Sequence, residues 1–242
     1  MQESIIVPAR FRGPPESGNG GYVAGVIAER FSTDALADSA VEVTLRAPTP
    51  LDRAMTLRRP DAHSLQMVLG ETLIAEAKRA ELSLEIPEPP SYAAALAAQP
   101  ESASFLDNIN PLIPEGTGFH PICFCCGADV APDEGLHVYA APVEGFEGVA
   151  AAWQPSSAFA DDQGLLPDAV LWAALDCPGA WAEHRAEADH PAVVLGRMAA
   201  RLVRPVPADG SYVTGGWPTG RDGRKLYSGT ALWSEDGTLG FE

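Results

Sequence analysis

The sequence predicts an α+β fold in which a curved antiparallel sheet wraps one apolar helix, and it predicts this unit twice. Each half of the chain contains one apolar helical segment followed by several short strand segments. The pattern Pro-x-Pro-x-Asp also occurs in both halves between two strands, at 48–52 and at 205–209. A helix that is apolar on most sides must be covered, and a strongly curved sheet can cover it.

The predicted elements follow the same order in both halves. The first half, residues 1–86, is expected to contain one helix, from Gly20 to about residue 31, and strands at 6–12, 41–45, 54–58, 64–69 and 73–84. The second half, residues 119–242, is expected to contain one helix, from about 167 to 182, and strands at 136–141, 149–153, 193–203, 212–217, 225–233 and 238–241. The last hairpin turns at "SEDGT".

A proline-rich linker, residues 87–118, is predicted between the halves. Proline and small residues dominate it, and neither helical nor strand periodicity persists. One short helix is expected at about 92–98. The chain therefore divides into an N-terminal unit, a linker and a C-terminal unit.

Composition limits the class of protein. The chain has 242 residues, of which 46% are hydrophobic, so it can bury a large core. A net charge of −17 argues against a nucleic-acid or anionic-membrane partner. The sequence contains neither an apolar run long enough for a membrane span nor the pattern of a signal peptide. We expect a cytoplasmic protein.

Four cysteines are too few for a disulfide scaffold. Cys123, Cys125 and Cys126 are close in sequence, and Cys177 follows far downstream. The spacing of Cys123 and Cys126 is typical of zinc ligands, but no second pair with this spacing exists. The sequence therefore favours reduced, partly buried thiols, and no metal is expected.

The stretch "SGNGGYVAG" places several glycines where a helix begins. Glycine inside a helix costs about 1 kcal/mol relative to alanine, so some group must need close access to this backbone. That group is either a ligand carbonyl at the helix start or a second helix packed closely against the first.

Two segments carry a resemblance to a known family. "GNGGYVAGVIA", with the strand "VEVTLRAPTPL" after it, resembles the first half of double-hotdog acyl-CoA thioesterases. "LPDAVLWAALDCPGAW" resembles the central helix of hotdog-fold thioesterases. The resemblance covers most of both halves but not the linker, and it implies a tandem (double) hotdog with two antiparallel central helices.

The resemblance also implies one active site shared by the two halves. Asn19, Gly20 and Gly21 occupy the helix opening, with Asn where many relatives have His, and Asp176 lies nine residues after Pro167. The mirror site, near Ala28 and Pro167, is expected to be inactive because it lacks these groups. An alternative alignment makes Asp176 a helix N-cap.

The implied reaction is hydrolysis of an acyl-CoA or related thioester. Asp176 is expected to act as general base, the Gly21 N–H to polarise the thioester carbonyl, and Asn19 to orient the water. Ser228 is carried over as the hydroxyl residue that positions the water. Arg58 and Arg59 are the expected contacts of the CoA phosphates.

Beyond CoA as part of the substrate, no cofactor is expected. The partner is a small-molecule acyl thioester, and the resemblance allows a homo-oligomer of double-hotdog protomers. Two other functions stay open. One is a non-catalytic acyl- or CoA-binding protein, and the other is an acyl-CoA hydratase or dehydratase, which would need a His near the acidic residue.

Overall fold

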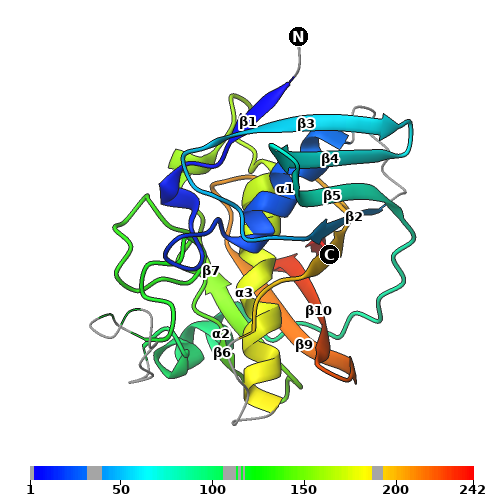
Figure 1. Cartoon of the computed structure of the whole chain (residues 1–242). Coiled ribbons are helices and arrows are strands. Elements are labelled where there is room, and N and C mark those ends of the chain that lie inside the picture. The colour runs from blue at the N-terminus through cyan, green and yellow to red at the C-terminus, as the bar shows by residue number, and fades with distance from the viewer. Residues whose placement is uncertain (1–2, 32–39, 106–112, 114–115, 117, 187–192) are drawn as a thin grey trace.

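The fold, seen in a computed structural model, is α+β, with two antiparallel sheets curled around a pair of long helices (Figure 1). The structure describes residues 3–31, 40–105, 113, 116, 118–186 and 193–242. The long helices are α1 (Gly20–Phe31) and α3 (Asp168–Ala186). The shorter α2 (Tyr92–Ala98) lies where the linker helix was predicted.

The first sheet has six strands in the order β1-β3-β4-β5-β2-β8. The strands are β1 (Ser4–Ile6), β2 (Ala40–Leu45), β3 (Ala54–Asp61), β4 (Ser64–Leu69), β5 (Thr72–Ala80) and β8 (Arg197–Ala200). The strand predicted at 6–12 is wrong beyond Ile6, because a short 3-10 helix occupies Ala9–Phe11.

The second sheet has five strands in the order β11-β10-β9-β7-β6. The strands are β6 (Ala141–Pro142), β7 (Val149–Trp153), β9 (Tyr212–Asp222), β10 (Lys225–Ser234) and β11 (Leu239–Phe241). The strand predicted at 136–141 is mostly absent. Its backbone bonds instead to the preceding loop, since Leu136 N donates to Phe124 O and Val138 N to Cys125 O.

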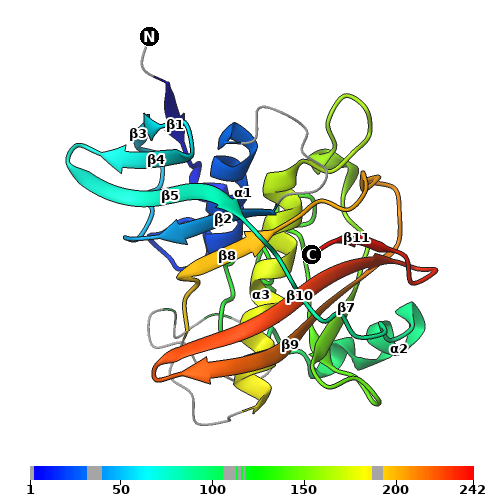
Figure 2. The ribbon, with the colours of Figure 1, turned by 90° about the vertical axis from the view of Figure 1, so that its right-hand side faces the viewer.

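One segment connects the edges of the two sheets (Figure 2). β8 pairs antiparallel with β2, and the chain just beyond it runs along β11, where Val203 N donates to Gly240 O. With this segment included, the second sheet follows the order β7-β9-β10-β11-(201–204). The first sheet has the same pattern, β1-β3-β4-β5-β2, so both halves thread their strands alike.

The central helix of the second half is longer than predicted. α3 continues through Pro178 to Ala186. A proline inside a helix removes one backbone hydrogen bond, and it is tolerated here where α3 packs against β9 and β10. Gly216 of β9 meets this turn so closely that an added Cβ would lie 2.3 Å from Pro178 O.

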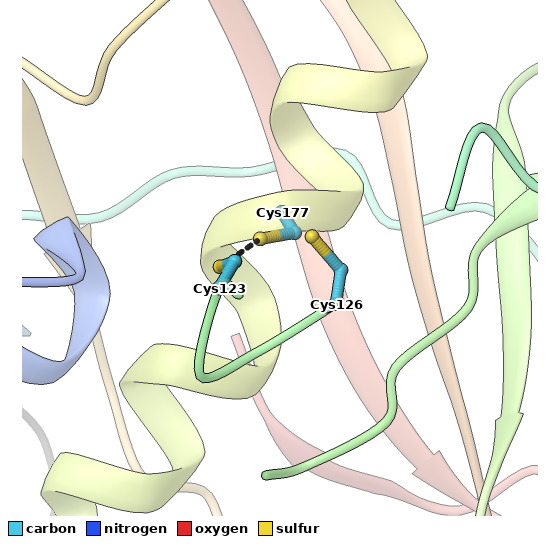
Figure 3. A group of neighbouring side chains, drawn as sticks. All are labelled: Cys123, Cys126 and Cys177. Carbon is cyan, nitrogen blue, oxygen red and sulfur yellow. Dashed lines mark hydrogen bonds between the residues drawn. The ribbon is translucent and has the colours of Figure 1, made fainter. Parts of the chain in front are cut away.

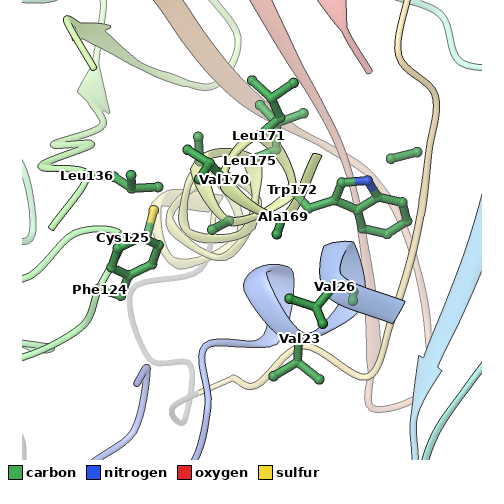
Figure 4. Close-up of a cluster of buried hydrophobic side chains, with 14 of the residues drawn as sticks. Val23, Val26, Phe124, Cys125, Leu136, Ala169, Val170, Leu171, Trp172 and Leu175 are labelled. Carbon is green, nitrogen blue, oxygen red and sulfur yellow. The ribbon is translucent and has the colours of Figure 1, made fainter. Parts of the chain in front are cut away.

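The main core lies between the two long helices and the sheets. It includes Val23 and Val26 of α1 and Leu171, Trp172 and Leu175 of α3 (Figure 4). A second apolar cluster covers the other face of the second sheet, where α2 contacts β7 and β9 and Ala95 is buried. Within the described residues, no helix combines the length and the apolar character needed to cross a membrane.

Candidate active site

The two long helices run antiparallel and approach closely at two glycines of α1. A Cβ added to Gly21 would lie 2.3 Å from Trp172 O, and one added to Gly25 would lie 2.5 Å from the Cα of Ala169. Real Cβ atoms essentially never approach other atoms within 3.0 Å. Both glycines are therefore needed for helix packing, which was one of the two explanations that the sequence left open.

The carboxylate of Asp176 lies at the N-terminus of α1. Gly21 N donates a hydrogen bond to Asp176 Oδ2 at 2.9 Å. Asn19 and the backbone of Gly20 lie close enough to this carboxyl group to lower its pKa. The first backbone N–H groups of a helix have no partner within the helix and carry partial positive charge, so an anion is stabilised there.

This contact changes the role expected for Gly21. The sequence assigned its N–H to a thioester carbonyl, whereas the structure assigns it to Asp176. Gly20 faces the open side: its added Cβ would meet the Leu195 side chain, and it lines a cavity. Asp176 also does not cap its own helix, because its carboxylate reaches across to α1.

Asn19 is the N-cap of α1 and is buried. Its Oδ1 accepts a hydrogen bond from Tyr22 N at 2.8 Å, and its Nδ2 lies 3.8 Å from Cys123 Sγ as a donor. The amide is therefore fixed at both ends. Its NH₂ group points toward Cys123 and Asp176.

Burial raises the pKa of the Asp176 carboxyl to about 6, and the hydrogen bond from Gly21 offsets part of that increase. The side chain is half-buried and borders the cavity. A carboxyl group with this pKa is mostly ionised at neutral pH, and it is a stronger base than an ordinary carboxylate.

A cavity of about 460 Å³ opens beside the start of α1. The groups able to do chemistry that line it include Asn19, His120, Cys123, Asp176 and Cys177. Much of its wall is apolar and includes Leu45, Phe119, Trp181, Val193, Val194 and Leu195. A cavity of this size with a few convergent polar groups is typical of a small-molecule site.

His120 is one of the cavity residues that the sequence reasoning did not place at the site. It lies 56 positions before Asp176, and no spacing pattern links the two residues. Its Nδ1 is buried and has no hydrogen-bond partner among the described residues. Burial lowers the pKa of His120, which favours the neutral imidazole.

Ser228 does not lie with Asp176. Its Oγ is 2.9 Å from Gly179 O and 3.2 Å from Glu183 Oε1, and it donates to these groups on the side of α3 that faces β10. Ser228 is not part of the cavity lining. The expectation that it positions the water finds no support in this geometry.

Arg58 and Arg59 also lie away from the cavity lining. Arg58 Nη2 donates to Gly70 O at 3.2 Å, and Arg59 Nη2 donates to Arg30 O at 2.5 Å. Arg30 is ten residues after Gly20, which is about 15 Å along the helix axis. The arginine on the cavity wall is instead Arg46, whose Nε donates to Glu76 Oε1 at 2.9 Å.

The opposite end of the helix pair was expected to lack ionisable groups, but the structure places one there. Ala28 is buried, but its neighbour Glu29 reaches the start of α3, where Ala169 N donates to Glu29 Oε1 at 2.9 Å. Each helix thus supplies a carboxylate to the start of the other. The ends still differ, because Asp176 lines the 460 Å³ cavity and Glu29 does not.

Comparisons with solved structures agree with this fold. A tesB protein of Mycobacterium avium subsp. paratuberculosis aligns at TM-score 0.63 and 10% identity, over 99% of this chain and 89% of that one. A putative thioesterase II of Thermobifida fusca gives 0.60 and 13%, over 99% and 90%. The dehydratase domain of RzxB from Pseudomonas fluorescens gives 0.56 and 15%, over 99% and 90%.

No family model and no curated protein sequence matches the chain. The likeness to solved structures is therefore one of fold, carried across nearly the whole chain at low identity. In fold, this chain resembles one protein described as having a hot dog fold and several described as thioesterases, two of them as thioesterase II.

Proposed function

We propose that this protein is a tandem double hotdog that hydrolyses an acyl-CoA or a related acyl thioester at the cavity beside α1. The matching strand orders of the two halves support the tandem arrangement. The observation that carries the activity is the Asp176 carboxylate, held by Gly21 N at 2.9 Å on the wall of a mostly apolar cavity.

In this proposal Asp176 is the general base. The Gly21 N–H holds Oδ2, so Oδ1 is available to accept a proton from a water molecule in the cavity. The water oxygen forms a bond to the thioester carbonyl carbon, and the carbon–sulfur bond then breaks. The carboxylic acid is released, and the departing thiolate takes up a proton to become the free thiol.

The start of α1 would stabilise the oxyanion that forms on the carbonyl oxygen. Because Gly21 is bonded to Asp176, we assign this contact to the Gly20 N–H and the Asn19 amide, which border the cavity. Both groups also lie close to the Asp176 carboxyl, so the oxyanion would bind beside that carboxyl group. The apolar wall would hold the acyl chain.

The test is Asp176→Asn, which keeps an acceptor for Gly21 but removes the base. We expect kcat to fall by roughly 10² or more in a thiol-release assay with a panel of acyl-CoA esters. The matched control is Asp168→Asn on the same helix, with an expected change of less than about threefold. Unchanged turnover in Asp176→Asn would refute the assignment, and acyl-CoA binding without turnover in the wild type would indicate a binding protein.

One observation favours a second candidate function, hydration or dehydration of an acyl thioester. His120 lines the same cavity as Asp176, which supplies the His and acid that such chemistry uses. An assay of enoyl-thioester hydration separates the two functions. Hydration that depends on His120, with no thiol release, would favour this candidate.

A further inference from the structure

Three buried cysteines meet beside the candidate active site (Figure 3). The sulfur atoms of Cys123, Cys126 and Cys177 all lie within 4.8 Å of one another. The first two come from one loop and the third from α3. The sequence lacked a second pair of closely spaced cysteines, and the fold supplies the additional thiol from 51 positions after Cys126.

The loop is shaped tightly around Cys123. Gly127 N donates to Cys123 O at 2.8 Å, and the Cys126 backbone N–H is directed at the Cys123 sulfur. A Cβ added to Gly127 would lie 2.6 Å from both Cys123 O and Pro121 O, so a side chain cannot be accommodated there. The "CFCCG" turn thus brings the first and last of its cysteines to the same place.

The spacing of the sulfurs fits a tetrahedral ion. With zinc–sulfur bonds of about 2.3 Å, the sulfurs of a tetrahedral site lie about 3.8 Å apart. Cys123 Sγ and Cys177 Sγ are 3.8 Å apart, which is far longer than a disulfide bond of about 2.05 Å. Cys123 and Cys177 also line the cavity, which provides a path of entry.

We propose that Cys123, Cys126 and Cys177 bind a zinc-class divalent ion as thiolates. Three soft sulfur ligands with this geometry suit zinc better than a hard cation such as magnesium. A divalent ion would offset most of the negative charge that three buried thiolates carry.

The ion would act as a structural link beside the catalytic groups. It would join the loop after the linker to α3 at Cys177, the residue next to Asp176. Cys123 also accepts a contact from the Asn19 amide. Metal binding would therefore fix the positions of Asn19 and Asp176 relative to each other. This role does not depend on which reaction takes place in the cavity.

The test uses reduced, full-length protein that has been stripped of metal with a chelator and then titrated with Zn²⁺ or Co²⁺ alone. We expect about one equivalent to bind. With Co²⁺ we expect a thiolate-to-cobalt charge-transfer band and the visible bands of a tetrahedral ion. This measurement needs no variant, so it does not depend on whether a cysteine substitution still folds.

Variants then identify the ligands. Cys177→Ser should weaken binding by at least about 100-fold, more than the loss of an outer-sphere partner usually does. The matched control is Cys125→Ser, a buried neighbour in the same loop that is outside the group of three. The proposal is overturned by a reduced wild type that binds no metal, or by equal losses in both variants.

Discussion

Replacing Gly21 by alanine tests the closest contact between the two halves. The added Cβ would lie 2.3 Å from Trp172 O, 2.8 Å from Asp176 Cβ and 2.9 Å from Ala173 Cα. Two of these atoms belong to the α3 backbone and the third is a Cβ, so no change of side-chain rotamer relieves the clash. To restore even 3.0 Å, the helices must separate by about 0.7 Å.

The energetic cost follows from that separation. Moving α3 by this amount stretches the 2.9 Å bond from Gly21 N to Asp176 to about 3.6 Å, which is no longer a hydrogen bond. Overpacking costs about 1–3 kcal/mol and a lost bond to a charged group about 1.5–3 kcal/mol. The higher helix propensity of alanine compared with glycine offsets at most about 1 kcal/mol of this loss. We expect Gly21→Ala to lower the free energy of unfolding by roughly 2–5 kcal/mol.

The assay is equilibrium unfolding in urea, read by circular dichroism and tryptophan fluorescence. Gly196→Ala is the control, because a Cβ there has no neighbour within 4 Å, and its unfolding free energy should change by less than about 1 kcal/mol. If Gly21→Ala unfolds within about 0.5 kcal/mol of the wild type, close helix packing does not explain this glycine.

The remaining predictions concern charged groups. Burial raises the pKa of Glu29 above 4.5, so ionisation of this side chain destabilises the folded state. The wild type should therefore lose stability relative to Glu29→Gln as pH rises from 4 to 8. An equal difference at both pH values in urea unfolding would contradict this. Arg46→Glu, on the cavity wall, should raise the KM for acyl-CoA, whereas Arg58→Glu with Arg59→Glu should leave it unchanged. Steady-state kinetics decide, and the reverse result would restore the original assignment of the CoA phosphates.

Local patterns predicted most elements well. The strand at 149–153 and the helix at 92–98 have the predicted bounds, because apolar periodicity and flanking prolines act over a few residues. The error at 136–141 has a different origin. That segment bonds to Phe124 and Cys125, and no local pattern reveals a partner in a loop.

The candidate site was predicted in part. The resemblance to double-hotdog thioesterases was enough to expect Asp176 near Gly21, since it implies two antiparallel central helices that share one site. The use of the Gly21 N–H was not predictable, because it depends on how closely the helices approach. His120 was missed because its distance from Asp176 along the chain carries no information about their distance in space.

The sequence by itself determined the two apolar helices, the hairpins and the glycine opening, since each depends on neighbouring residues and on backbone preferences. Only the tertiary structure decided which groups share the cavity and which cysteines meet. Loop 119–127 and α3 are brought together by packing of the whole core, which sums many weak contacts between distant segments. That sum is not encoded in any one stretch of the chain, so Cys177 joins Cys123 and Cys126 only once the protein has folded.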